Sequence, residues 1–286
     1  MTQKIRKFLE ERRPETPCLV VDLDVIARNY SDLARALPQA DIFYAVKANP
    51  AKEVLTTLLP LGAYFDTASI YEIETCLDIG ASPDRIAYGN TIKKARDIAS
   101  AFEYGIRLFA FDSRAELAKL KTHAPGASVF CRIFMDGAGA DWPLSRKFGC
   151  EPDLAIELLC QAAEDGLHPA GVSFHVGSQQ RNLAQWDVAI ERAAMVFSEL
   201  GARGIKLELM NMGGGFPANY RQDIEPVENY GEAIRASVVK HFGNQPPRII
   251  AEPGRSIAGD AGILQTEVVL VAEKSREPDR RWVFLD

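Results

Sequence analysis

Short apolar runs alternate with helical patterns along most of the chain. Each run is rich in β-branched or aromatic residues and is followed by a polar turn and a segment with apolar residues at helical spacing. In residues 153–165, for example, Leu154, Leu158, Leu159 and Ala162 fall on one helical face. Eight such runs are predicted to be strands: 42–48, 63–68, 85–90, 107–112, 128–134, 170–176, 207–213 and 248–253.

Strands that alternate with helices in this way predict a parallel sheet. Eight successive strand–helix units favour a closed (β/α)8 TIM barrel over an open doubly wound sheet, which the pattern alone leaves as the alternative. We therefore expect an α/β protein in which a barrel occupies residues 37–258.

The segments on either side of this barrel have patterns of their own. Residues 1–36 are predicted to contain a short strand, CLVVD, and an amphipathic helix that leads into the barrel. Residues 259–286 are predicted to form two apolar strands around the polar turn KSREPDRR. Because the sequence ends within a strand, we expect this segment to be the beginning of a C-terminal β domain that is truncated.

Composition and charge narrow the class of protein. The 286 residues include 33 Lys and Arg against 39 Asp and Glu, so the net charge is −6 and no basic block exists for nucleic acid. The N-terminal segment MTQKIRKFLEERRP lacks the apolar stretch of a signal peptide, and no apolar run long enough to span a membrane follows. We therefore expect a cytoplasmic protein without a membrane or nucleic-acid partner.

Cysteine and histidine spacing gives no indication of a metal site. The five cysteines lack a CxxC pair, which favours reduced thiols in a cytosolic protein. The four histidines are dispersed and form no HExxH pattern. We expect no metal.

Polar residues occur at the ends of the predicted strands, where barrel enzymes hold their sites. Lys47 ends the first strand behind Ala45 and Val46. We expect burial to lower the pKa of its amine towards the neutral form that Schiff-base chemistry needs. The alternative is a lysine that snorkels to solvent from a strand end.

Four further strands carry a polar residue near the same end of the predicted barrel. Each of these residues alone is more often structural than catalytic, and this includes the histidine. Their concentration at one end of one barrel favours a site made by Asp66, Arg132, His175 and Glu252.

Two predicted loops are suited to an anion. Gly213, Gly214 and Gly215 follow the seventh strand, and Pro253–Gly254–Arg255 follows Glu252 after the eighth. Consecutive glycines let backbone N–H groups approach an anion, and the loops after strands 7 and 8 commonly hold phosphate in TIM barrels. Arg255 would add a bidentate contact.

A phosphate cradle opposite a Schiff-base lysine indicates pyridoxal 5′-phosphate (PLP) as the cofactor. In such a site Glu252 would keep the pyridine nitrogen protonated and His175 would stack on the ring. Neither GxGxxG nor GxxxxGK[ST] is present, which disfavours a dinucleotide or a P-loop nucleotide.

The motifs, taken in order, resemble the fold-type III PLP-dependent decarboxylases of basic amino acids over about residues 15–286. The pattern is more similar to ornithine and lysine/ornithine decarboxylases than to diaminopimelate decarboxylase. The motifs are FYAVKANP (43–50), FDTASIYEIE (65–74), GNTIKK (89–94), FDSRAEL (111–117), SRKFGC (145–150), SFHVGSQ (173–179), GGGFP (213–217) and EPGRSI (252–257).

The resemblance implies a role for each predicted site residue. Lys47 would be the lysine that bonds to the cofactor, His175 the ring-stacking residue and Glu252 the partner of the pyridine nitrogen. The residues implied to hold the cofactor around them are Ser178, Gly215 and Arg255 at the phosphate, and Asp66 and Arg132 in support.

The resemblance also implies an activity and an assembly. It implies decarboxylation of L-ornithine to putrescine, with L-lysine to cadaverine as a further reaction, in polyamine biosynthesis. Family members carry a C-terminal β domain with a catalytic cysteine that reaches the neighbouring subunit, so a homodimer with shared sites is implied for the full-length protein. None of the five cysteines falls in that motif, which would lie beyond Asp286.

Alternative functions remain at this point. One is diaminopimelate decarboxylase, and another is a non-catalytic homologue that binds PLP or regulates a partner. Alanine racemases share the barrel but present a cation to the ring nitrogen, so Glu252 disfavours them. Residues 135–149 are predicted to be a mobile lid, with an ordinary exposed loop as the alternative.

Overall fold

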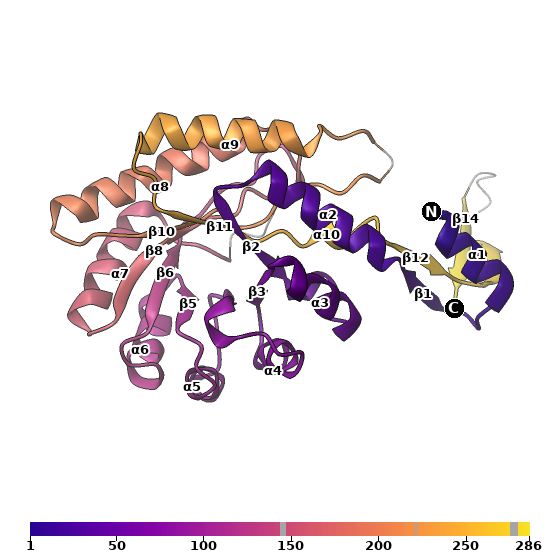
Figure 1. The fold of residues 1–286 in the computed structure, drawn as a ribbon, viewed down its shortest axis with the longest axis horizontal. Helices are drawn as coiled ribbons and strands as arrows, with labels where there is room; N and C mark the ends of the chain where they lie inside the picture. The colour runs from indigo at the N-terminus through magenta and orange to yellow at the C-terminus, as the bar shows by residue number, and fades with distance from the viewer. Residues whose placement is uncertain (144–146, 221, 275–279) are drawn as a thin grey trace.

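The structure is a computed structural model that describes residues 1–143, 147–220, 222–274 and 280–286. A closed barrel of parallel strands forms its centre, in the spatial order β10-β11-β2-β3-β4-β5-β6-β8 (Figure 1). The last strand pairs with the first and closes the sheet, so the predicted (β/α)8 barrel is confirmed and the open sheet is excluded. The barrel strands are β2 Ala40–Ala45, β3 Tyr64–Thr67, β4 Ile86–Tyr88, β5 Leu108–Phe111, β6 Ser128–Arg132, β8 His168–Ser173, β10 Leu209–Asn211 and β11 Arg248–Ala251.

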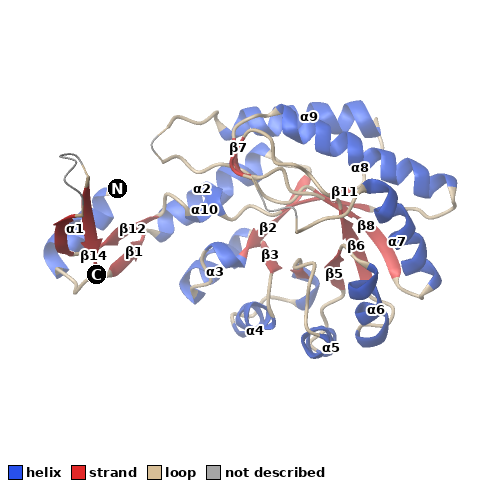
Figure 2. Cartoon of the chain, turned by 180° about the vertical axis from the view of Figure 1, so that it is seen from behind, coloured by secondary structure: helices blue, strands red, loops and turns tan. Residues whose placement is uncertain are grey.

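Helices follow the strands along the chain and lie outside the barrel (Figure 2). The helix predicted over 153–165 is present as α7, which begins with a proline in its first turn, where the missing N–H costs no hydrogen bond. The helices are α2 Leu23–Ala36, α3 Lys52–Leu58, α4 Ile70–Asp78, α5 Ala95–Glu103, α6 Arg114–His123, α7 Pro152–Glu164, α8 Ala184–Ala202, α9 Val227–Phe242 and the short α10 Arg255–Ala258. Two 3-10 turns link helices to the strands that follow them: η2 (Leu59–Leu61) lies between α3 and β3, and η3 (Pro83–Arg85) between α4 and β4.

Side chains alternate between two cores on either side of the barrel wall. In β2, Phe43 points into the barrel, whereas Ile42 and Tyr44 belong to the larger core between strands and helices. The interior core is small and includes Ala87, Phe130 and other residues contributed by seven of the strands. The filled interior leaves the barrel mouth as the place for a site.

Asp66 and Arg132 lie in β3 and β6, whereas the other three candidate residues lie just past the strands that were predicted to carry them. β2 ends at Ala45, and Lys47 lies in the following 3-10 turn η1 (Val46–Ala48). His175 follows the end of β8 by two residues and Glu252 follows β11 by one. The apolar residues directly after the last paired positions, such as Val46, Phe174 and Met212, are still buried, so the apolar pattern extends beyond the paired residues and the predicted strands are too long.

A small lobe at the side of the barrel contains both chain termini (Figure 1). In it, β1 (Cys18–Val21) pairs antiparallel with β12 (Gly262–Gln265), and β13 (Val268–Glu273) pairs antiparallel with β14 (Arg281–Leu285). The predicted strand CLVVD and the helix after it are confirmed as β1 and α2. The first apolar run of 259–286 was predicted as one strand, but it divides into β12 and β13. Most of the turn KSREPDRR lies outside the described residues, and the predicted domain boundaries stay a prediction.

Helix α1 (Gln3–Arg12) was not predicted. Thr2 caps it by accepting a hydrogen bond from the Ile5 backbone N–H, which satisfies one of the free donors of the first turn. Ile5 is its one buried residue. Ile5, Phe8 and Leu9 fall at helical spacing, so the sequence does contain a short apolar stripe, which the prediction did not use.

Part of the predicted lid forms a β-ribbon. β7 (Ala140–Trp142) pairs antiparallel with β9 (Ser178–Gln180), which follows β8 at the barrel mouth. Residues 144–146 lie outside the described part of the chain, and the mobility of the lid stays a prediction. Among the described helices, none combines the length and apolar character needed to cross a membrane.

Candidate active site

A cavity of about 320 Å³ opens at the carboxyl ends of the barrel strands. Eight of the twelve predicted site residues line it, and four more lie around it. The lining residues from the prediction are Lys47, His175, Ser178, Gly214, Gly215, Glu252, Gly254 and Arg255. The sequence motifs, which are far apart along the chain, therefore meet in one place.

Lys47 projects into this cavity and pairs with Asp66. Its Nζ lies 3.0 Å from Asp66 Oδ2; the lysine side chain is 60% exposed, because it faces the cavity, and the aspartate only 3%. The Asp66 carboxylate, with Glu252 nearby, raises the pKa of Lys47 above its ordinary value against the effect of burial. The expectation of a lowered pKa is therefore wrong for the protein without cofactor, because the ion pair outweighs desolvation.

Glu252 lies near this pair and is held by Asn211. Asn211 Nδ2 donates a hydrogen bond of 2.5 Å to Glu252 Oε1. Burial, together with the nearby Asp66 carboxylate, raises the pKa of Glu252 to about 7. Glu252 can therefore carry or release a proton near neutral pH, and a cation brought next to it would favour its ionised form.

His175 lines the same cavity as a neutral imidazole. Its Nδ1 accepts a hydrogen bond of 3.1 Å from the Gly177 backbone N–H. Burial and the nearby cations of Arg132 and Lys47 lower the pKa of His175 to about 3. A neutral ring in this position can stack on an aromatic ligand without adding charge to it.

The glycines after β10 are required by their backbone conformation and by close contacts. Gly213 and Gly215 have φ values of +62° and +103°, which side-chain-bearing residues rarely adopt. A Cβ at Gly214 would lie 2.6 Å from the Glu252 carbonyl oxygen and 3.3 Å from His175 Nε2. The loop thus brings bare backbone close to the two residues that were predicted to face the cofactor ring.

Arg255 forms the other side of the glycine loop. Its Nε donates to Ser178 Oγ at 3.0 Å and its Nη1 to the Tyr220 hydroxyl at 3.4 Å. The guanidinium also lies 4.4 Å from the ring centre of Trp142 in β7. Ser178, Arg255 and the backbone of Gly214 and Gly215 make a polar end to the cavity that is suited to an anion.

Arg132, Gly213, Asp66 and Pro253 support this cavity from around it. The Arg132 guanidinium lies 5.3 Å from the ring centre of Phe148, and burial lowers its pKa. The Pro253 carbonyl accepts a hydrogen bond of 3.0 Å from the Ala45 N–H, which ties the loop after β11 to the end of β2. These four residues adjoin the lining residues, as predicted, but their roles towards a ligand stay predictions.

Three residues of the site were not predicted. Asn211 is fully buried in β10, and a polar residue in the apolar run LELMNMG was the signal that could have revealed it. Tyr220 lines the cavity from the loop after the glycines, and Trp142 packs on Arg255 from the predicted lid. Neither aromatic residue stands out in the sequence, because only the fold brings it to Arg255.

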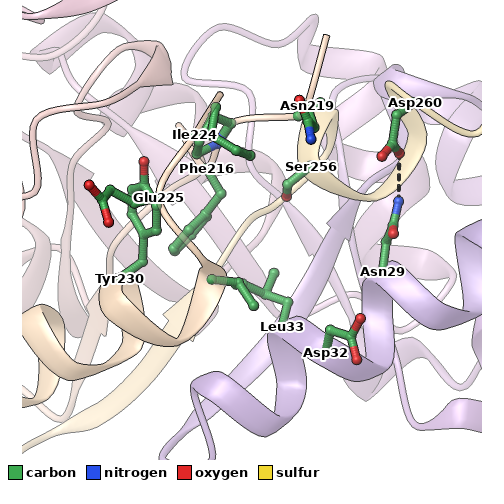
Figure 3. Close-up of a pocket in the computed structure, with 13 residues that line it drawn as sticks. Asn29, Asp32, Leu33, Phe216, Asn219, Ile224, Glu225, Tyr230, Ser256 and Asp260 are labelled. Carbon is green, nitrogen blue, oxygen red and sulfur yellow. Dashed lines mark hydrogen bonds between the residues drawn. The ribbon is translucent and has the colours of Figure 1, made fainter. Parts of the chain in front are cut away.

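A second, smaller cavity of about 140 Å³ lies behind the glycine loop, between α2, α10 and the segment that leads into α9 (Figure 3). Phe216 and Tyr230 form its wall, and Asn29 Nδ2 donates to Asp260 Oδ1 at 2.7 Å across one side. The predicted site residues line the larger cavity instead. The barrel mouth is therefore the candidate active site.

The larger cavity fits the phosphorylated pyridine aldehyde that the sequence suggested. One end has an amine, Lys47, and the other has Arg255, Ser178 and open glycine backbone. Asp66 Oδ1 is buried and has no hydrogen-bond partner among the described residues, so the site retains an unused acceptor beside Lys47. Glu252 and His175 provide an acid partner and a stacking surface for a ring between the two ends.

Comparison with known proteins also indicates a pyridoxal-binding protein. The family model for the pyridoxal binding domain of pyridoxal-dependent decarboxylases matches residues 23–259. The lysine/ornithine decarboxylase of Selenomonas ruminantium is 36% identical over 287 residues, covering 100% of this chain and 72% of the relative. Antizyme inhibitor 2 of Xenopus laevis is 36% identical over 255 residues, covering 89% of this chain and 56% of the relative. The chain thus spans part of the length of the proteins it matches.

Solved structures agree with the sequence comparison. A crystal structure of SrLDC in complex with PLP and cadaverine has a TM-score of 0.87 at 34% identity, covering 100% of this chain and 72% of the other. The lysine/ornithine decarboxylase from Vibrio vulnificus complexed with putrescine has a TM-score of 0.86 at 32% identity, covering 99% of this chain and 74% of the other. The chain therefore belongs to the pyridoxal-dependent decarboxylases, with pyridoxal phosphate as cofactor.

Proposed function

We propose that the protein decarboxylates a basic L-amino acid in cytoplasmic polyamine biosynthesis. The main reaction would convert L-ornithine to putrescine, and a further reaction would convert L-lysine to cadaverine. The observation that carries this proposal is the juxtaposition of Lys47, His175 and Glu252 with the glycine loop and Arg255 in one cavity. The names of the relatives, lysine/ornithine decarboxylase among them, support the substrate class.

The residues that would hold the cofactor divide into two groups. Ser178, Gly215 and Arg255 would bind the phosphate, and His175 and Glu252 would contact the ring. When bound, PLP supplies a cationic aromatic ring that accepts the electron pair left by the departing carboxylate. The protein contributes orientation and charge at fixed positions.

Lys47 is placed to bond to the cofactor and to handle a proton. Its Nζ is held 3.0 Å from Asp66, so its side chain is oriented before any ligand arrives. Asp66 keeps the amine protonated, and transfer of that proton would free the nitrogen for bonding. The same amine faces the cavity and would also serve there as a proton donor.

Glu252 and His175 would set the electrostatics of the ring. A carboxylate next to the pyridine nitrogen stabilises its protonated form, which the Glu252 pKa of about 7 allows near neutral pH. His175 stays neutral and so does not compete for that negative charge. An alanine racemase would need a cation where Glu252 lies, so this residue favours decarboxylation.

The choice among basic amino acids rests on relatives and motifs. Two of the solved neighbours were complexed with cadaverine or putrescine, which are the products of lysine and ornithine decarboxylation. The motifs FDTASIYEI and GNTIKK also favour the ornithine type over diaminopimelate decarboxylase. Incubation with ornithine, lysine and diaminopimelate, followed by identification of the product, separates these activities.

We propose further that the full-length protein is a homodimer with shared active sites. The predicted catalytic cysteine and the residues for the distal amine are not among the residues of this sequence, and relatives are longer than the chain. A C-terminal β domain that begins with β12 to β14 would provide them. Sedimentation of the full-length protein, with activity measured across the dimer dissociation range, tests the assembly.

A second function is favoured by one relative. Antizyme inhibitor 2 matches this chain at 36% identity, the same value as the decarboxylase of Selenomonas ruminantium. A non-catalytic homologue would bind PLP or a partner protein without turnover. Retention of Lys47, His175 and Glu252 argues against it, because a pure binding protein has no physical need of that set. Bound PLP without any amine product from the full-length protein would favour the non-catalytic function.

The decisive test is replacement of Lys47 by alanine in the full-length protein. Lys47→Ala should abolish both the visible absorbance of lysine-bound PLP and the formation of diamine. Lys52→Ala, which removes a surface lysine paired with Asp78 outside the cavity, is the matched control and should retain both. An undiminished absorbance band in Lys47→Ala would contradict the proposed function.

A further inference from the structure

Asn211 closes a ring of three hydrogen bonds beneath the cavity. Its Oδ1 accepts from the Gly213 N–H at 2.9 Å, and its Nδ2 donates to Glu252 Oε1 at 2.5 Å. The ring closes on the backbone, where the Glu252 N–H donates to the Gly213 carbonyl at 2.7 Å. The end of β10, the first glycine of the loop and the residue after β11 are thus fixed to one another by one side chain.

This ring requires a side chain that both donates and accepts a hydrogen bond, as an amide does. An amide can accept at its oxygen and donate at its nitrogen at the same time, and Asn211 does both while fully buried. An ionised carboxylate at this position could accept from Gly213 but would have no proton to donate to Glu252. An apolar side chain could do neither, and two buried polar groups would lose a partner.

The surroundings of Glu252 make this donor important. Asp66 is the nearby like charge, whereas Lys47 and Arg132 are the nearby cations, and Asn211 is the residue that hydrogen-bonds the carboxylate. Burial alone disfavours the ionised form. Burial and Asp66 raise the pKa of Glu252, whereas Lys47, Arg132 and the Asn211 hydrogen bond lower it. Without the Asn211 donor, only the two cations would lower this pKa.

We propose that Asn211 is a positioning residue that holds the Glu252 carboxylate and the glycine loop in one fixed geometry. The two ends of the cofactor site are thereby coupled. A displacement of Glu252, which would face the pyridine nitrogen, would also displace the glycine loop, which would bind the phosphate. This inference rests on the proposed function only where cofactor binding is measured.

The first measurement needs no cofactor. Glutamate carboxyl groups labelled with ¹³C report their own titration by NMR, and Glu252→Gln identifies the signal of Glu252. In the cofactor-free full chain, Asn211→Leu should raise the midpoint of the Glu252 titration by about one pH unit or more. Ser237→Ala, which removes a buried hydrogen bond to Asp187 far from the cavity, is the control and should leave the midpoint unchanged.

The second measurement separates the two arms of the amide. Asn211→Asp retains the acceptor for Gly213, and Asn211→Leu retains neither bond. Competition of inorganic phosphate with PLP should therefore stay within about two-fold of wild type in the aspartate variant and weaken by about ten-fold or more in the leucine variant. The affinity for pyridoxal, which lacks the phosphate, should fall in both.

Two results would overturn the inference. One is a Glu252 titration in Asn211→Leu that coincides with wild type although the variant is folded; should that variant not fold, Asn211→Ala, which also removes the donor without adding a charge, provides the same comparison. The other is an equal loss of phosphate competition in both variants. If wild-type protein bound no PLP, the proposed function would fail, whereas the Glu252 titration would still decide the role of Asn211.

Discussion

Replacement of Glu252 by glutamine should change how the stability of the cofactor-free protein depends on pH. The pKa of Glu252 rises from its ordinary value of 4.5 to about 7 on folding, so the folded state binds the proton more tightly than the unfolded state. This contribution to stability is complete below pH 4.5 and is lost as the pH rises through 7. The shift corresponds to about 3 kcal/mol at most, from about 1.4 kcal/mol per pKa unit.

The assay is urea unfolding of wild type and Glu252→Gln at intervals between pH 4.5 and pH 8. Because glutamine resembles the protonated carboxyl, the variant should gain in unfolding free energy relative to wild type as the pH rises, by up to about 3 kcal/mol. The difference in unfolding free energy between the two proteins is the informative quantity, because His175 changes the stability of both proteins with pH in the opposite direction to Glu252. Its pKa falls from 6.5 to about 3 on folding, so its contribution grows as the pH rises through that window.

Replacement of an exposed glutamate provides the control for this test. Glu199→Gln changes an exposed carboxyl on α8 and should give a constant difference from wild type across the pH range. The reasoning would be refuted if the Glu252→Gln difference were as flat as that of the control. A difference that fell with rising pH would show that Lys47 and Arg132 outweigh burial and Asp66 at this carboxyl.

The remaining predictions concern other parts of the molecule. Gly214→Ala would place a Cβ 2.6 Å from a backbone carbonyl oxygen, so PLP affinity measured by fluorescence titration should fall at least about ten-fold; Gly201→Ala, which meets no atom within 4 Å, should leave it unchanged. Arg255→Gln should weaken binding of PLP more than binding of pyridoxal, and an equal loss would place the phosphate elsewhere. Glu116→Gln should lower the urea unfolding free energy by about 3–5 kcal/mol, because the fully buried Lys93 would lose its carboxylate partner; a change below about 1 kcal/mol would contradict this.

The architecture could be predicted because periodicity is a local property of the sequence. Each barrel strand is an apolar run of a few residues, and each of the eight was recognised by composition and by the turn after it. The ends of the strands could not be placed, since burial continues past the last paired residue. Helix α1 was missed although Ile5, Phe8 and Leu9 fall at helical spacing, because the segment is short and mostly charged and Ile5 is its only buried residue.

Residue identities in the site followed from motifs, but the interactions between residues did not. Asp66 and Lys47 were both candidates, yet the register that places Asp66 opposite Ala45 on the neighbouring strand is what brings its carboxylate to the lysine amine. Burial alone suggested a lowered pKa, and this contact reverses the direction. Pairing across strands is a tertiary property, so the sign of the shift could not be predicted from one strand.

The same argument explains why Asn211 matters and why it was missed. Within β10 it is one polar residue among apolar neighbours, and its sequence context indicates neither of its two partners. Only the parallel pairing of β10 with β11 places the end of β11 beside the end of β10, so that one amide can reach both Gly213 and Glu252. The candidate site residues are therefore positioned by contacts between adjacent strands, and substitutions that preserve the motifs but break these contacts should still impair the site.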